Sequence, residues 1–180
     1  MQMIKSQLKI RIFGDPCLRQ KSEQVKEVGP GERMLIEAML DTMYESKGVG
    51  LAAPQVGINQ QIFVADTGAG AIVVVNPKIL KKKGSVSQEE GCLSIPGVTV
   101  KVRRPEKIVV QYFDANNRLV EKELNELLSR VFQHETDHLN GKLITDYASL
   151  SAKLKIKKQL KELAKLYNPL HRMKKATSHG

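Results

Sequence analysis

The sequence predicts an α+β protein in which antiparallel sheets surround a central helix and a further helix closes the chain. Strand-like runs are gathered between about residues 61 and 124. Runs with helical spacing stand before them and after them, and no regular alternation of strand and helix indicates a doubly wound sheet. At 180 residues the chain suits one domain, taken as residues 1–180 with a basic helix and tail at about 149–180.

The first part of the chain predicts a short strand, a turn and a helix. "LKIRIFGDPCLRQKS" opens with strand-like alternation and turns at Gly14-Asp15-Pro16. "ERMLIEAMLDTMYESKG" follows with helical spacing, and Gly48 is a suitable end. One face of this helix is predicted to fill the core with Met34, Leu35, Ala38, Met39, Thr42 and Met43.

The middle of the chain predicts antiparallel strands. "QIFVADT" and "AIVVVNP" flank "GAG", which indicates a hairpin. "KKKGS" is interpreted as a solvated turn rather than a nucleic-acid patch. The segment from Gly97 to Leu124 predicts two or three further strands, with a turn at Asn116-Asn117.

Two helices complete the chain. "KELNELLSRVFQHETDHL" has apolar residues at helical intervals, and Asn140-Gly141 is a suitable stop. That apolar face is predicted to contain Leu124, Leu127, Leu128, Val131 and Phe132. The final helix, roughly Ser149 to Leu166, is expected to dock on the body through Ile156, Leu160, Leu163 and Tyr167.

Charge and cysteine content restrict the class of protein. The net charge is +10, but nine Lys or Arg and one acid follow Ser149, so the basicity describes the tail rather than the whole surface. No apolar run approaches the ~20 residues of a membrane span, and the N-terminus has no signal-peptide pattern. Two cysteines do not suggest a disulfide framework, and we expect a reducing, cytoplasmic location.

The stretch "QHETDH" contains the strongest chemical signal. His134 and His138 are four residues apart, so on a helix they lie on one face and can bind one metal ion. Glu135 is placed to act as a general base, as in H-E-x-x-H hydrolases. A catalytic site of this kind needs a third protein ligand and one open position.

The sequence offers several third ligands: Cys92, Cys17, His171, His179 and the carboxylates. Cys92 lies in the shaped segment "QEEGCLSIPG", although a small buried cysteine is the favoured explanation of this stretch taken alone. Lys47 to Gly57, "KGVGLAAPQVG", permits tight turns and presents one amide, Gln55, in apolar surroundings. It lacks the Lys-Ser/Thr of a phosphate-binding loop.

Taken together, "GVGLAAPQ", "EGCLS" and "QHETDH" resemble, in order and spacing, the three motifs of peptide deformylases. The resemblance extends from "FGDPCLR" to about Asp146. It implies a metal-dependent hydrolase of protein biosynthesis that removes the N-terminal formyl group from formyl-methionyl nascent peptides and releases formate. These peptides would be its substrates in N-terminal methionine processing.

The resemblance also implies roles for individual residues. Cys92, His134 and His138 would bind one divalent metal, expected to be Fe²⁺, with Zn²⁺, Ni²⁺ or Co²⁺ able to substitute. Metal-bound water would attack the formyl carbon, with Glu135 as general base and acid. The side chain of Gln55 and the backbone N–H of Leu93 would stabilise the oxyanion.

The resemblance also implies positions that contact the substrate or support the site without taking part in the reaction. Substrate is expected to contact Val49, Gly50, Gly91, Leu127 and Val131, although simple core packing explains the apolar ones almost as well. Glu90 and Arg104 resemble an ion pair that holds the Cys loop, and Asp137 is expected to be a helix-surface acid. Thr99 stands where some relatives have a substrate-binding Arg, and Glu126 where Gly is common.

Three alternatives to this interpretation concern partners and function. The basic final helix is either simply solvated or contacts ribosomal RNA through its lysines. An H-E-x-x-H peptidase would take a Glu or His downstream as its third ligand, and the Glu and His residues beyond the motif are Glu162, His171 and His179. A metal-stabilised RNA-binding module would need aromatic platforms, but aromatic residues are only 4%. No membrane partner is expected, and a monomer is favoured.

Overall fold

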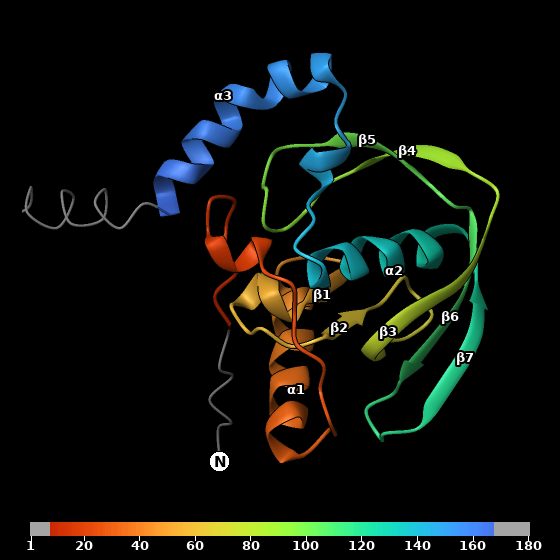
Figure 1. Cartoon of the computed structure of the whole chain (residues 1–180). Coiled ribbons are helices and arrows are strands. Elements are labelled where there is room, and N and C mark those ends of the chain that lie inside the picture. The colour runs from red at the N-terminus through yellow and green to blue at the C-terminus, as the bar shows by residue number, and fades with distance from the viewer. Residues whose placement is uncertain (1–7, 168–180) are drawn as a thin grey trace, which may run out of the picture.

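The computed structural model describes residues 8–167 and shows the α+β arrangement that the sequence predicts (Figure 1). The main helices are α1 (Pro30–Glu45), α2 (Glu126–Leu139) and α3 (Leu150–Tyr167). The strands are β1 (Gly50–Ala52), β2 (Ile62–Ala65), β3 (Ile72–Lys83), β4 (Val86–Glu90), β5 (Val100–Arg104), β6 (Lys107–Phe113) and β7 (Leu119–Leu124). Short 3-10 helices span Pro16–Arg19, Ala53–Val56 and Ile144–Tyr147.

The strands form two antiparallel sheets. Five strands pair in the order β1-β2-β3-β6-β7, while β4 and β5 form a separate pair that we call the β4–β5 arm (residues 86–104). Helix α2 lies between strands β1 and β2 and this arm (Figure 1). The expected hairpin of β2 and β3 is confirmed, as are three strands after Gly97 with a turn at Asn117, whose φ is +59°.

The core fixes α2 on the large sheet. Phe132 is fully buried, and its ring lies 5.0 Å from that of Phe63 on β2 and 5.9 Å from that of Tyr112 on β6. Leu139 at the end of the helix belongs to the same cluster. Helix α2 ends as predicted, with Asn140 as its last half-helical residue and Gly141 at φ +67°. The helix that bears the two histidines is therefore anchored from behind.

Helix α1 forms where expected, but its buried face was predicted only in part. Met39, Thr42 and Met43 are buried, as expected. The prediction that Met34 is buried is wrong, because its side chain is 72% exposed, and Ile36 is buried instead. Residues 36, 39 and 43 follow helical spacing, and Met34 lies two positions before Ile36, on the other side of the helix.

Several local predictions are also corrected. Residues 8–13 form no strand; instead the backbone N–H of Arg11 donates to the carbonyl of Gln55, and that of Phe13 to the carbonyl of Ser94. The three lysines of "KKKGS" belong to β3, and Gly84 and Ser85 connect this strand to β4. Leu124 ends β7 rather than lying on the helix, and β1 was not expected at all.

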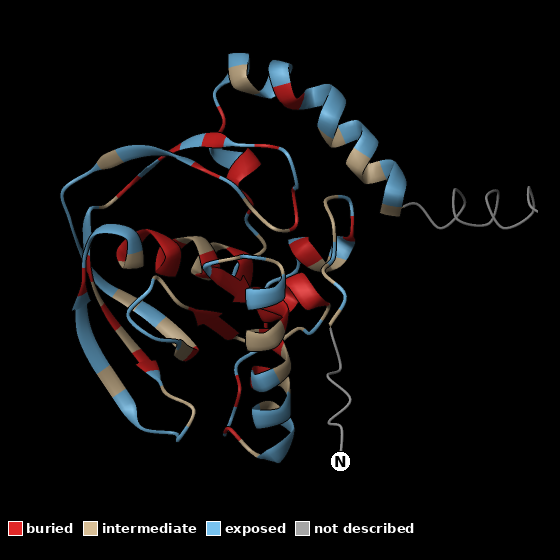
Figure 2. Ribbon diagram, turned by 180° about the vertical axis from the view of Figure 1, so that it is seen from behind, coloured by how far each residue is buried: buried red, intermediate tan, exposed pale blue. Residues whose placement is uncertain are grey.

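Helix α3 docks through three of the four residues predicted, and Tyr167 is not part of the cluster that they join. Ile156 is buried, and Leu160 and Leu163 pack against a cluster that includes Ile95 and Leu143. Most of the remaining surface of α3 is exposed (Figure 2). His171 and His179 lie outside the described residues. Among helices within residues 8–167, none combines the length and apolar composition that crossing a bilayer requires.

Candidate active site

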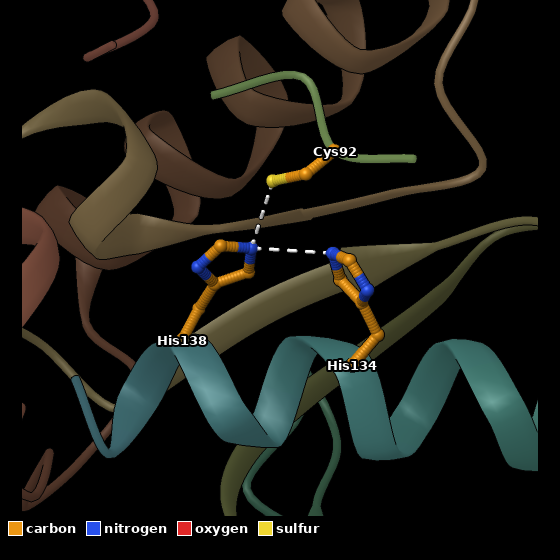
Figure 3. A group of neighbouring side chains, drawn as sticks. All are labelled: Cys92, His134 and His138. Atoms are coloured by element: carbon orange, nitrogen blue, oxygen red, sulfur yellow. Dashed lines mark hydrogen bonds between the residues drawn. The ribbon is translucent and has the colours of Figure 1, made fainter. Parts of the chain in front are cut away.

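Cys92, His134 and His138 converge on one point between the loop after β4 and helix α2 (Figure 3). Sγ of Cys92 lies 3.3 Å from Nε2 of His138, which lies 3.2 Å from Nε2 of His134. All three donor atoms are within 4.8 Å of one another. The third ligand that the motif required is therefore close to the two histidines, as expected for Cys92.

The separations suit a four-coordinate cation. Metal–nitrogen bonds of about 2.0–2.1 Å and metal–sulfur bonds of about 2.3 Å, at tetrahedral angles, separate donors by roughly 3.3–3.6 Å. The measured 3.2 and 3.3 Å are close to these values. One thiolate and two imidazoles are also donors of the kind that soft and borderline transition metals prefer.

The electrostatics of the two imidazoles favour a cation at the same point. Burial lowers the pKa of His134, but interactions with Cys92 and Glu90 outweigh it and raise that pKa to about 10. Burial, followed by the charge of His134, holds the pKa of His138 well below its usual value, so this ring stays neutral and keeps a lone pair for binding. The donor set thus attracts positive charge without itself being fully protonated.

Each histidine has a different environment at its second ring nitrogen. Nδ1 of His134 lies 3.1 Å from Oε2 of Glu90, a carboxylate that can fix the ring and its tautomer. Nδ1 of His138 is buried without a hydrogen-bond partner among the described protein atoms. Glu90 is the acceptor that the sequence alone did not identify.

A cavity of about 390 Å³ opens beside the donor atoms. Its lining includes the residues expected to contact substrate: Val49, Gly50, Gly91, Leu127 and Val131. Cys92, Leu93, His134 and Glu135 line it as well. The side chains of Val49 and Leu127 are 47% and 49% exposed, so these two are not simply core residues.

Glu135 is buried against the cavity floor. A Cβ atom on Gly50 would meet its carboxylate and would lie 2.9 Å from Cγ1 of Val131, so the glycine allows β1 to approach α2 this closely. Oε2 of Glu135 has no hydrogen-bond partner among residues 8–167. Burial raises the pKa of this carboxyl group to about 7, which suits proton transfer near neutral pH.

Gln55 is held with its amide nitrogen toward the cysteine. Its Oε1 accepts a hydrogen bond of 2.8 Å from the backbone N–H of Ala52, which requires the amide oxygen to face Ala52. Nε2 then lies 3.6 Å from Sγ of Cys92 and 3.2 Å from Oγ of Ser94. Only one side chain in this set, Ser94, was not anticipated from the sequence.

Charged side chains surround the cluster of Cys92, His134 and His138. The expected ion pair is present: Arg104 donates from Nε and Nη2 to the two oxygens of Glu90, at 2.6 and 2.9 Å. The prediction for Asp137 is wrong, because it accepts from Nη1 of Arg104 and from the hydroxyl of Tyr147, both at 2.8 Å. The sequence interpretation also missed Arg130, which donates to Glu90; its position four residues before His134 was the available signal.

Cys17 has no place in this cluster. Its thiol donates to the carbonyl of Pro54 at 3.5 Å, and burial, together with the hydrogen bond and charge of Asp15, raises its pKa to about 12. A thiol that holds its proton so firmly is a poor metal ligand. This leaves Cys92 as the sulfur donor of the described residues.

Comparisons with known proteins agree with the geometry. Residues 7–154 match the model of the family described as polypeptide deformylase. A peptide deformylase of Thermotoga sp. (strain RQ2) is 46% identical over 158 residues, covering 87% of this chain and 96% of that protein. The crystal structure of the Thermotoga maritima peptide deformylase is 47% identical, with a TM-score of 0.78 over 79% of this chain and 98% of that one.

A more distant structure supports the same conclusion. The peptide deformylase of Legionella pneumophila is 37% identical and gives a TM-score of 0.84, covering 90% of this chain and 98% of that one. A family match over most of the chain and relatives aligned over nearly their full length establish membership. The chain belongs to the polypeptide deformylase family, the metal-dependent hydrolases that remove N-terminal formyl groups from nascent peptides.

Proposed function

We propose that this chain hydrolyses the formyl group of formyl-methionyl peptides with Cys92, His134 and His138 as metal ligands and Glu135 as the proton carrier. The observation that carries this assignment is the convergence of one sulfur and two ring nitrogens within 4.8 Å at the edge of the cavity. A divalent cation held there would lower the pKa of a neighbouring water and make hydroxide available near neutral pH. Side chains and one backbone N–H group of this protein supply the proton transfer and the stabilisation of the oxyanion.

Glu135 moves the proton in this scheme. The water oxygen adds to the formyl carbon, and the carboxylate of Glu135 accepts the proton that the water loses. When the carbon–nitrogen bond breaks, Glu135 returns that proton to the departing amine, so the products are formate and a free α-amino group. Its burial and its pKa of about 7 support both halves of this role.

Gln55 and Leu93 stabilise the negative charge that develops on the formyl oxygen. The amide of Gln55 is oriented by Ala52, so its N–H group is already aimed toward the cysteine side of the cavity. The backbone N–H of Leu93 comes from the same loop as Cys92. Donors fixed before the reaction need no reorganisation when the charge appears, which is why they lower the barrier.

The methionine side chain of the substrate occupies the apolar part of the cavity. Leu127 and Val131 are one helical turn apart on α2, and Val49 lies on the opposite segment before β1. Gly50 and Gly91 offer backbone groups to an extended peptide without side chains in the way. A linear thioether side chain matches an apolar wall of this kind.

Fe²⁺ is the ion we expect to support the highest activity, with Zn²⁺, Ni²⁺ or Co²⁺ as substitutes. The sulfur and imidazole donors support a transition metal but do not separate these ions by affinity alone. The test is formate release from a formyl-Met peptide by protein loaded with each ion in the absence of oxygen. Glu135→Gln, loaded to the same metal content, should lose nearly all activity; unchanged turnover would overturn the role of Glu135.

The same assay separates deformylation from the peptidase alternative. A peptidase of the H-E-x-x-H class takes a downstream third ligand, whereas the sulfur here comes from Cys92, upstream of the helix. Parallel incubation with formylated and unformylated peptides should release formate from the first and leave the peptide bonds of both intact. Cleavage of an internal peptide bond would favour the peptidase.

We also propose that the lysines of α3 contact ribosomal RNA, where formylated nascent chains emerge. Lys157, Lys158 and Lys161 are exposed, while Ile156 and Leu160 attach the helix to the body. Replacing the three lysines with Glu should therefore leave the fold intact, weaken ribosome pelleting and reduce its salt slope by about 1 for each lost phosphate contact. Unchanged pelleting with ribosomes would refute the proposed contact between these lysines and ribosomal RNA. A cytoplasmic, monomeric enzyme is the setting this proposal assumes.

A further inference from the structure

One face of α2 is polar and is directed at the β4–β5 arm. Its members recur at helical spacing: Arg130, Gln133, His134 and Asp137. Each makes a hydrogen bond to the arm or its end: Gln133 to the carbonyl of Pro105, His134 to Glu90, and Asp137 to Arg104. The contact between helix and arm is thus polar and largely buried, unlike the apolar contact between α2 and the large sheet.

This contact sets the spacing of the metal donors. The two histidine donors belong to α2, whereas Cys92 comes two residues after Glu90, the last residue of β4. Any sliding of the arm along α2 would move the sulfur relative to the two rings. The residues that tie the arm to the helix therefore control whether the donor atoms keep their separations of 3.2 and 3.3 Å.

Arg130 makes the most extensive tie. Its Nη1 donates to Oε1 of Glu90 at 2.5 Å and to the carbonyl of Val102 on β5 at 3.1 Å. Its Nη2 donates to the carbonyl of Val86 on β4 at 2.8 Å. One side chain of α2 is therefore bonded to the backbone of both strands of the arm and to the carboxylate that accepts from His134. Arg130 is only 8% exposed, so these bonds are protected from water.

Arg130 also completes the charge balance around Glu90. Arg104 and Arg130 supply two guanidinium charges against the carboxylates of Glu90 and Asp137. Oε1 of Glu90 accepts from both arginines, while Oε2 accepts from Arg104 and His134. Buried ions are costly unless they are paired and fully hydrogen-bonded, and loss of one partner leaves an uncompensated charge.

We propose that Arg130 is a positioning residue that holds the Cys92 loop in register with the two histidines and so slows release of the metal. The inference rests on the proposed function, because it takes the three-ligand metal site as given. Arg130 also lines the cavity, so a direct contact with substrate is the competing role. Its two terminal nitrogens, however, already donate to Glu90 and to the carbonyls of the arm.

The test compares metal release from Arg130→Met, Arg130→Lys and wild type, each loaded with Ni²⁺ or Co²⁺ and mixed with excess chelator. Outer-shell partners of metal ligands typically affect affinity or activity by 10–100-fold, so Arg130→Met should release metal at least about tenfold faster. Arg130→Lys keeps a cation for Glu90 but cannot make all three bonds, so its rate should be intermediate. Arg118→Met removes an exposed ion pair with Asp114 on the surface and serves as the matched control.

Thermal unfolding and steady-state kinetics distinguish a positioning role from a general structural one. Faster release in folded Arg130→Lys, with KM near that of wild type, would support the proposal even if Arg130→Met proved too unstable to assay. Release within twofold of wild type in Arg130→Lys, or a raised KM with unchanged release, would overturn it. Wild-type protein that retains no metal would overturn the proposed function too, whereas retention by wild type and variants alike would overturn this inference alone.

Discussion

The substitution Gln55→Leu tests the oxyanion role with the least disturbance of the metal ligands. Gln55 is 1% exposed, and its amide nitrogen lies 3.6 Å from the sulfur of Cys92. Leucine has nearly the same volume but no donor. Loss of one preorganised oxyanion donor costs about 2.7–4 kcal/mol of barrier, so kcat should fall by ~10²–10³. Metal content should stay near that of wild type, because none of the three ligands changes.

The same substitution has a stability component that must be separated from catalysis. The backbone N–H of Ala52 loses its acceptor, and a buried unpaired donor costs roughly 1–3 kcal/mol of unfolding free energy. Kinetics should therefore be measured well below the unfolding temperature of the variant, as formate release under saturating formyl-Met peptide. Metal content is determined on the same sample.

Gln55→Glu provides the matched comparison. A glutamate retains an oxygen that can accept from Ala52, but in its ionised form it has no N–H to donate. If the catalytic role is correct, both variants are slow; if Gln55 only supports the backbone of Ala52, Gln55→Glu keeps its activity. Turnover of Gln55→Leu within about twofold of wild type, at full metal content, would refute the reasoning.

Three further predictions test packing, close approach and pH dependence. Phe132→Ala should lose about 3–5 kcal/mol in urea unfolding, since its ring is fully buried between Phe63 and Tyr112, whereas Phe113→Ala, at 39% exposure, should lose much less. Gly50→Ala should lower kcat by ~10² without loss of metal, because a new Cβ would displace the Glu135 carboxylate. Gly31→Ala, which has open space around its Cβ position, is the control. Equal kcat values for the two variants would contradict the prediction. Burial, with Asp15, raises the pKa of Cys17 from 9.0 to about 12, so its contribution to stability is complete below pH 9 and declines as pH rises toward 12. The difference in unfolding free energy between wild type and Cys17→Ala should shrink over that range, and a constant difference would count against the shift.

Much of the fold and of the site was predictable because the signals were local. His134 and His138 need only a helix to share a face, and Gly141 needs only a left-handed φ to end that helix. The hairpin of β2 and β3 follows from two alternating runs around a glycine turn. An element could be predicted from the sequence where its local pattern agreed with its environment in the folded protein. The predicted strand at residues 8–13 was wrong because this segment bonds to a 3-10 helix and to the loop after Cys92 rather than to a strand.

The environment of the ligands was harder to predict, since it depends on pairs that are distant in sequence. Glu90 and His134 are 44 residues apart, and no spacing rule connects a strand end with a helix face. Asp137 shows a different limit. It stands three residues after His134, so helix geometry already placed it near the same face, but an acid on a helix is usually solvated. Only its ion pair with Arg104, which comes from β5, makes it a half-buried partner rather than a solvated acid.

The buried charges show why such residues resist prediction and why they matter for function. An arginine or aspartate in a helix is indistinguishable by pattern from a solvated surface residue until its partner is known, because either environment satisfies it. In this protein, ion pairs fill the space between α2 and the β4–β5 arm: Arg104 pairs with Glu90 and Asp137, and Arg130 pairs with Glu90. That space separates the helix with two metal donors from the loop with the third. A polar contact suits this place because its bonds are directional, and directional bonds fix register where an apolar contact would tolerate sliding.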